Sequence, residues 1–386
     1  MKLFRPGPLA ALAVVLLAAA WKMVFIFWDV VPFNADEAVV GLMARHILMG
    51  ERPVFFYGQA YMGSLDAFLV AAGFAALGQH VWVIRLVQLL LYLGTVASTC
   101  WAGQAAFESR EAGLLAAFLM AVPTVNVTLY TTASLGGYGE ALLLGNLLLL
   151  LSLTLARNRL SGGSAPFPGG HFVLWGVLAG CGLWANGLTL VYSLPSGLYL
   201  AWMILKSRRG WLAPFFLFAG FGFVLGSLPW WIFAVSNGPQ QLILELFGKA
   251  VAVEREPWLA RTLNHLVNFL LLGSSVIFGF RPPWAVKWLA APLILPVLAF
   301  WIGCLAFFFR QTVRPGRHQH AYLLLAGVCL VLIAGFLFTP FGVDPSGRYF
   351  LPLAVPLALA AAQAVLSIAR RPWQAAALAA VIVLYQ

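Results

Sequence analysis

Long apolar runs alternate with short polar connections along the whole chain. Each run offers roughly 20 apolar residues, the length that an α-helix needs to cross a bilayer. The pattern therefore predicts an all-α, polytopic membrane protein with about eleven transmembrane helices. The predicted spans are about 8–28, 82–105, 111–129, 138–156, 172–188, 188–205, 212–235, 287–309, 321–340, 350–369 and 373 onwards.

Two connections are much longer than the rest, at about 29–80 and 236–286. Six predicted spans, an even number, lie between them, so both long connections fall on the same side of the membrane. We expect a single transmembrane domain over residues 1–386. The sequence stops at Gln386 inside an apolar run, so we expect that the natural chain can continue into a further C-terminal part.

The first apolar run has Lys2 and Arg5 ahead of it and small residues at 18–20, as a signal peptide would. It continues to Trp28, however, which is longer than a typical signal-peptide core. We therefore expect an uncleaved first span. Lys22 lies inside this run and is expected to snorkel towards the outer interface.

The first long connection carries its own helix signals. Asn34 is a suitable N-cap, and Glu37 follows three residues later, ahead of an apolar stripe that ends at Gly50. This pattern predicts an amphipathic helix lying in the membrane interface. A second, more apolar helix is predicted from Ser64 to Gly78.

Composition agrees with a membrane protein. The 386 residues are 62% hydrophobic and only 9% charged, whereas a soluble domain carries about 25% charged residues. The formal net charge is +11, but the basic residues are spread over short loops. They form no patch of the kind that binds nucleic acid, and the positive-inside rule explains them better.

The signs of the charges orient the chain. The short basic connections all fall on one predicted side, which is therefore cytoplasmic. Only Glu108 and Glu111 of the twelve acidic residues share that side. The other acidic residues lie on or near the outer side and indicate that function faces outward. They are Asp29, Asp36, Glu37, Glu51, Asp66, Glu140, Glu245, Glu254, Glu256 and Asp344.

Asp36 and Glu37 are the leading candidates for chemistry. Acidic residues favour the first turn of a helix because they complement its dipole, and this structural explanation stays open. The functional interpretation is that one carboxylate accepts the proton of an attacking hydroxyl. Such a base suits a reaction in which a phosphate departs easily, with a cation rather than a proton donor to stabilise it.

These residues carry a resemblance to a known group of enzymes. An outer Asp-Glu pair just after the first span resembles the GT-C superfamily of membrane glycosyltransferases, which take sugars from polyprenyl-phosphate carriers. Within it the chain is most similar to family 39, relatives of protein O-mannosyltransferases and lipid A aminoarabinose transferases. The stretches that match are 61–68 (Tyr-Met-Gly-Ser-Leu-Asp-Ala-Phe), Arg85-Leu86, Pro123 and 348–353 (Arg-Tyr-Phe-Leu-Pro-Leu). Members of the family often have Pro-Pro where this chain has Met62-Gly63. This difference concerns the expected binding of the acceptor more than that of the donor.

The resemblance implies roles for particular residues. Asp36 matches the catalytic acidic position, Glu37 matches its partner, and Glu140 lies near a second acidic position of the relatives. An interfacial carboxylate at a helix start explains Glu140 equally well. Arg348, followed by Tyr349, is expected to bind the donor phosphate, because a guanidinium makes paired hydrogen bonds to phosphate.

The second long connection contributes further candidates. Arg261 and His265 are possible contacts to the donor or acceptor, although most charges of this segment read as a solvated helix face. No cofactor is assigned. Some related enzymes use a divalent ion, for which Asp36, Glu37 and Glu140 have suitable oxygens. His318 and His320 stand in a basic loop and are not expected to bind metal.

The predicted function is transfer of a sugar from a polyprenyl-phosphate carrier to an acceptor hydroxyl on the outer face, with inversion. The partners are the lipid-linked sugar, membrane lipid and an acceptor that is a protein, a lipid or a glycan. The expected location is a bacterial or archaeal plasma membrane. Two alternatives remain: a transporter or flippase of lipid-linked sugars, and an inactive relative that only binds lipid. A transporter would be expected to show charges within its spans or a structural repeat.

Two smaller patterns are interpreted structurally. Gly222 and Gly226 lie within a predicted span, so their spacing indicates close helix packing and not a nucleotide loop. The four cysteines fall inside apolar runs without pairing spacing and are expected to be free. They are Cys100, Cys181, Cys304 and Cys329.

Overall fold

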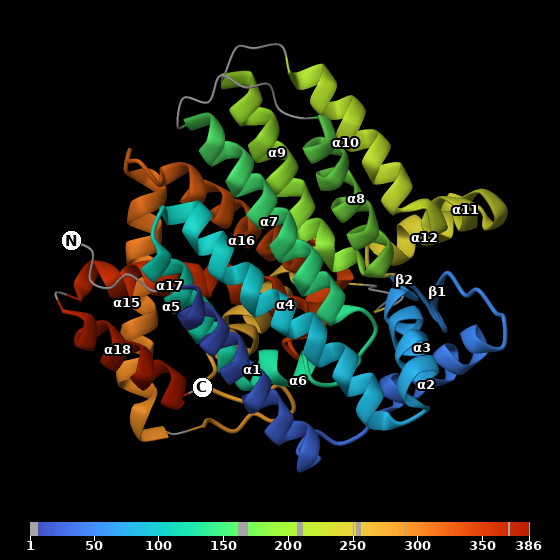
Figure 1. Cartoon of the computed structure of the whole chain (residues 1–386), viewed down its shortest axis with the longest axis horizontal. Coiled ribbons are helices and arrows are strands. Elements are labelled where there is room, and N and C mark those ends of the chain that lie inside the picture. The colour runs from blue at the N-terminus through green and yellow to red at the C-terminus, as the bar shows by residue number, and fades with distance from the viewer. Residues whose placement is uncertain are drawn as a thin grey trace.

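The computed structural model describes residues 7–160, 169–206, 211–249, 251, 256–289, 291–369 and 371–385. Over these residues the chain is a bundle of helices with one small hairpin (Figure 1). Seven helical segments of the described chain are long and apolar enough to cross a membrane. The predicted all-α, multi-pass membrane fold is therefore confirmed.

The seven long segments match seven of the predicted spans. Short 3-10 turns lead into three of them, because the chain enters the bundle there through proline-containing or capped turns. The helices are α1 (Pro8–Phe27), α4 (Val81–Phe107), α7 (Tyr138–Leu160), α9 (Leu190–Lys206), α15 (Ile294–Val313), α16 (Gln319–Phe338) and α17 (Ala354–Ile368).

The other four predicted spans are shorter or broken. The predicted span 212–235 consists of α10 (Leu212–Gly226) and α11 (Leu228–Asn237), which meet at an angle of 70°. Pro229 stands in the first turn of α11 and cannot donate a backbone hydrogen bond into α10. The predicted span 111–129 likewise ends early, as α5 (Arg110–Ala121), and continues after Pro123 as α6 (Val125–Tyr130). The last two are α8 (Gly169–Ala185) and α18 (Pro372–Tyr385).

The two helices predicted in the first long connection are confirmed. The first is α2 (Ala35–Leu48), and the side chain of Asn34 caps it by accepting the Glu37 backbone N–H at 3.1 Å. The second is α3 (Leu65–Leu77), which ends at Gly78 with φ of 88°. Between them the chain forms a hairpin that the sequence did not indicate, with strands β1 (Phe55–Phe56) and β2 (Gln59–Gly63).

The second long connection is a series of short helices. They are α12 (Pro239–Leu246), α13 (Trp258–Val267), a π-helix (Asn268–Gly273) and α14 (Ser274–Ile277). Glu254 and Arg255 of this segment lie outside the described residues.

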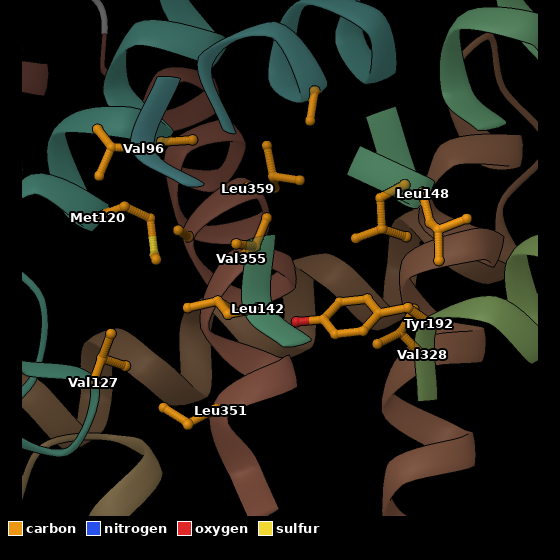
Figure 2. Close-up of a cluster of buried hydrophobic side chains, with 14 of the residues drawn as sticks. Val96, Met120, Val127, Leu142, Leu148, Tyr192, Val328, Leu351, Val355 and Leu359 are labelled. Atoms are coloured by element: carbon orange, nitrogen blue, oxygen red, sulfur yellow. The ribbon is translucent and has the colours of Figure 1, made fainter. Parts of the chain in front are cut away.

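The core lies where α4, α5, α7, α9, α16 and α17 meet. Figure 2 shows apolar side chains from all six helices pointing into this region, among them Val96, Leu148 and Leu359. Many large apolar side chains on α1, α10 and α15 face outward instead, such as Leu16 at 59% and Leu295 at 76% exposed. A surface of this kind requires lipid around it.

Small residues bring α8 and α10 close together. A Cβ at Gly222 would lie 2.2 Å from the Val173 carbonyl oxygen, and one at Gly226 would lie 2.3 Å from that of Val177. The helix-packing interpretation of these glycines is therefore confirmed. The four cysteines are free, as predicted.

Candidate functional site

Asp36 and Arg348 line one cavity of about 790 Å³. They reach it from opposite parts of the chain, since Asp36 lies in the first turn of α2 and Arg348 begins the 3-10 helix Arg348–Leu353. Most of the remaining wall is apolar or aromatic and comes from α1, α6 and the loops beside them. The wall includes Trp21, Phe25, Val30, Val31, Pro32, Asn34, Pro123, Val125, Leu129, Tyr130, Leu135, Tyr138 and Trp284.

The electrostatics of Asp36 reflect this position. Partial burial raises the pKa of the Asp36 carboxyl, and the positive charge of Arg348 opposes that shift. Burial is the larger of the two effects. A raised pKa makes an aspartate a stronger base than its usual value of about 3.9 allows.

A tight turn holds Arg348 at the cavity. The Asp344 carboxylate accepts the Arg348 Nε–H at 2.7 Å and the Ser346 backbone N–H at 2.8 Å. Gly347 has φ of 105°, and its carbonyl accepts a hydrogen bond of 3.1 Å from the Asn126 side chain of α6. A Cβ on Gly347 would lie 2.2 Å from the Asn126 oxygen, so only glycine fits.

Glu37 does not share the cavity with Asp36. Neighbouring residues of a helix point about 100° apart, so Asp36 faces the cavity while Glu37 turns into the protein. Glu37 is fully buried and accepts two hydrogen bonds of 3.2 Å from Arg85 of α4. Arg85 also donates to Asp29 and to the Val31 carbonyl, each at 2.7 Å. This network fastens the start of α2 and the chain before it to α4.

Glu140 lies in a second buried acidic cluster. Its carboxyl group adjoins that of Asp66, both residues are at most 2% exposed, and neither Glu140 carboxyl oxygen has a hydrogen-bond partner among the described residues. Asp66 also accepts hydrogen bonds from Gln88, at 3.0 Å, and from the Ser134 hydroxyl. Two adjoining buried carboxyl groups cannot both be ionised, so the pair holds a proton. The cluster joins α3, α4 and α7 behind the cavity.

Tyr349 faces a different space from Arg348. The buried Tyr349 hydroxyl has no hydrogen-bond partner among the described residues, and Tyr349 and Tyr61 of β2 both line a narrow apolar cavity of about 170 Å³. Its other walls come from α9, α12 and α16, including Leu194, Phe247 and Leu332. The cavity therefore begins beside the Arg348 turn and runs along apolar helix surfaces.

Arg261 and His265 are not among the residues that line either cavity. His265 is 2% exposed, and its Nδ1 lies 3.0 Å from the Leu337 carbonyl oxygen at the end of α16. Arg261 lies one helical turn earlier on α13. The geometry thus gives His265 a packing partner in α16, and neither residue forms part of the wall of the Asp36 cavity.

Lys22 shows that one expectation was wrong. The side chain is 0% exposed and does not snorkel. Its ammonium group donates to the Thr128 carbonyl at 2.9 Å and to the Thr131 and Thr132 hydroxyls at 2.6 and 2.8 Å. All three ammonium hydrogens thereby find acceptors in α6 and the turn after it, which joins α1 to the wall of the cavity.

The sequence indicated Asp36 and Arg348 but not the cavity around them. Arg85 and Lys22 carried a usable signal, because an ionisable residue inside an apolar run needs a buried partner. Trp284 and Tyr130 carried none, since aromatic residues are common at the ends of spans.

The described residues do not assemble a metal site. No three His, Cys, Asp or Glu side chains among them gather in a way that could hold a metal ion. Of the three oxygen donors considered, Glu37 is bound to Arg85 and Glu140 adjoins Asp66, and neither lines the cavity with Asp36. His318 packs against Phe107, and His320 bonds to Tyr199.

Comparison with solved structures defines the fold. The structure resembles archaeal oligosaccharyltransferase AglB from Archaeoglobus fulgidus in complex with an inhibitory peptide and a dolichol-phosphate, with a TM-score of 0.59 and 16% identity. It also resembles ArnT from Cupriavidus metallidurans bound to undecaprenyl phosphate, with a TM-score of 0.57 and 16% identity. The A. fulgidus oligosaccharyltransferase complexed with Zn and sulfate gives a TM-score of 0.62 at 15% identity.

These two enzymes are GT-C superfamily membrane glycosyltransferases, so the predicted GT-C fold is confirmed. The likenesses cover 97% of this chain and 54% of AglB, and 95% of this chain and 63% of ArnT. The chain therefore spans a little over half the length of these solved proteins. No protein-family model and no curated protein sequence matches it.

Proposed function

We propose that the protein is a membrane glycosyltransferase that uses a sugar carried on polyprenyl phosphate. The observation that carries this proposal is the single cavity lined by both Asp36 and Arg348. It combines a base, a cation and a largely apolar wall, which suits a ligand with a phosphate, a sugar and a lipid chain. The AglB and ArnT structures of the same fold contain dolichol-phosphate and undecaprenyl phosphate, respectively.

In this proposal the reaction is one inverting displacement. The acceptor oxygen attacks the anomeric carbon from the face opposite the phosphate, and its proton passes to Asp36. The bond between the anomeric carbon and the phosphate oxygen breaks, and the electron pair leaves with the lipid phosphate. Arg348 stabilises the negative charge that develops on that phosphate. Asp36 and Arg348 face the outer side in the proposed orientation.

Glu37 and Glu140 act through position rather than contact with the reacting atoms. Glu37 supports Asp36 by holding the first turn of α2 against Arg85. The adjoining Glu140 and Asp66 lie behind the cavity, where Asp66 accepts hydrogen bonds from Gln88 of α4 and from Ser134. Tyr349 and Tyr61 line the apolar cavity, which we propose accommodates the first isoprene units of the carrier. Arg261 and His265 remain candidate contacts for a part of the substrate outside the cavity.

The test uses purified protein in nanodiscs with labelled undecaprenyl-phosphate sugars and a panel of protein, lipid and glycan acceptors. Released lipid phosphate is the readout. Asp36→Asn should abolish release and leave the protein folded, because burial already disfavours the charged form of Asp36. Glu51→Gln is the matched control, since Glu51 lies in the same connection with a side chain that is 58% exposed.

Full release by the D36N protein would overturn the assignment of Asp36. Movement of the labelled lipid across the membrane without release of lipid phosphate would instead support the flippase alternative. Donor binding without either outcome, for all acceptors tested, would support an inactive lipid-binding relative.

A further inference from the structure

A second polar cavity lies at the opposite end of the bundle from Asp36. Its volume is about 400 Å³, and it is formed where α4, α7 and α9 end and α16 begins. The Asp36 cavity and the Glu37–Arg85 pair lie near the other ends of α4 and α7. The side chains that line the second cavity include Glu108, Arg157, Trp202, Lys206, Arg317 and His320.

The lining of this cavity is net positive. Arg157, Lys206 and Arg317 are cationic, and Glu108 is the acidic member of the lining. The Glu108 carboxylate already accepts two hydrogen bonds from Arg317, one of them at 3.0 Å from Nε. Arg157 and Lys206 add positive charge from two further helices. This net positive charge attracts an anion with several oxygens, and phosphate matches both guanidinium and ammonium donors.

The cavity is built by contacts between distant segments. Glu108 has a left-handed backbone with φ of 51°, which is uncommon for a residue with a side chain. That conformation turns the chain at the end of α4 and brings the carboxylate to Arg317, which lies 209 residues away in sequence. His320 is held by the Tyr199 hydroxyl, 3.1 Å from its Nδ1. Backbone strain maintained by tertiary contacts is typical of functional sites.

The mouth of the cavity adjoins the lipid-facing surface of α9. Trp202 is 42% exposed, and the Lys206 ammonium lies 5.3 Å from the centre of its ring. Leu198 and Leu205 on the same helix are 70% and 60% exposed. A tryptophan between a basic cavity and an apolar helix face occupies the level of lipid headgroups. A phosphate that enters from the bilayer would keep its acyl chains against α9.

We propose that this cavity binds the phosphate headgroup of an anionic phospholipid, in the leaflet opposite the Asp36 cavity. The site is independent of the proposed glycosyl transfer. Lipid binding there makes the packing of the ends of α4, α7, α9 and α16 depend on which phospholipids the membrane contains. Basic pockets between transmembrane helices recognise anionic headgroups by the same chemistry.

Native mass spectrometry of the purified full chain tests the proposal. Phosphatidylglycerol, phosphatidylethanolamine and inorganic phosphate are titrated separately. We expect one phosphatidylglycerol to be retained at low concentration, and the R157Q/K206Q protein to bind it about tenfold more weakly. Arg310→Gln is the matched control, because Arg310 is an exposed residue at the end of α15 that does not line the cavity. The R157K/K206R protein keeps both charges and should retain the lipid.

Three results would overturn the proposal. The first is equal retention of phosphatidylglycerol by wild type and R157Q/K206Q. The second is a loss of phosphatidylglycerol binding in R310Q as large as that in R157Q/K206Q, which would indicate an effect of general surface charge. The third is displacement of the lipid by millimolar inorganic phosphate, which would make free phosphate the ligand. If R157Q/K206Q elutes as aggregate, the titration is made with R157K/K206Q, which removes one charge only.

Discussion

Glu37 and Arg85 form a two-pronged ion pair that is almost sealed from solvent, at 0% and 2% side-chain exposure. The pair joins the first turn of α2 to the second long span, and Asp36 stands beside it in the sequence while facing the cavity. Two adjacent carboxylates thus have different surroundings. One is fixed by a buried cation, and the other is partly open to a cavity.

This difference predicts that neutralising Glu37 lowers the stability of the protein and that neutralising Asp36 does not. Glu37→Gln leaves Arg85 buried with a weaker partner, so the free energy of unfolding should fall by about 3 kcal/mol. Asp36→Asn should leave it nearly unchanged. Thermal unfolding in detergent measures both. The E37M variant leaves Arg85 without its buried carboxylate partner, so the E37M/R85M double variant should be less destabilised than E37M alone. If the double variant loses as much free energy of unfolding as the two single variants together, the pairing is contradicted.

The acid limb of the transfer activity should depend on Arg348. A general base must be deprotonated, so activity falls as the pH falls through the Asp36 pKa, which burial places above its usual value. Arg348→Gln removes the charge that opposes this shift, so the pKa rises further and the acid limb moves to higher pH. The profile of kcat is measured at saturating donor. Arg348→Lys keeps the charge, so the pH at which kcat falls should not change. If that pH also stays unchanged in R348Q, the effect of the Arg348 charge on the Asp36 pKa is refuted.

Glu140 should tolerate an amide but not truncation. Glu140→Gln keeps the size of the side chain and can donate a hydrogen bond to the adjoining Asp66 carboxylate, so stability and transfer should stay close to wild type. Glu140→Ala leaves an empty space in the buried cluster beside Asp66 and should lower the free energy of unfolding by about 1–3 kcal/mol. Unfolding and initial rates are measured on both variants. Loss of transfer in a fully stable E140Q protein would show instead that Glu140 takes part in the chemistry.

Gly347 should be irreplaceable in the turn that presents Arg348. Gly347→Ala places a Cβ against the Asn126 side chain on a left-handed backbone, and should lower the free energy of unfolding by about 2 kcal/mol or more. Gly303→Ala is the control, because no atom lies within 4 Å of a Cβ there. The thermal midpoint of G303A should stay level or rise. Equal midpoints for the two variants would show that the turn adapts.

The apolar cavity beside Tyr349 should determine affinity for the carrier chain. Leu194→Trp narrows that cavity, so KM for a long-chain donor should rise about tenfold, while KM for a short-chain donor should not change. Leu198→Trp, one turn further along α9 and 70% exposed, is the control. A KM that rises equally for both donor lengths would place the chain elsewhere.

Much of the fold could be predicted from the sequence, because hydrophobic length alone decides what spans a bilayer. The chain needs about 20 apolar residues per span, and seven of the eleven predicted spans became the seven long segments. The helix cap at Asn34 was readable for the same reason, since it is a local interaction over three residues. The breaks at Ser227 and Pro123 were missed because continuous apolar composition masks a bend.

The sequence also identified Asp36 and Arg348 as unusual charges in an apolar chain. Only the tertiary structure decided that they share a cavity, because they are far apart in sequence and their meeting depends on how α2 packs on α4. It likewise decided that Glu37 and Lys22 are buried. A local pattern specifies that a side chain is ionisable, whereas its partners come from other helices, and those partners decide whether the charge is exposed, paired or placed for chemistry.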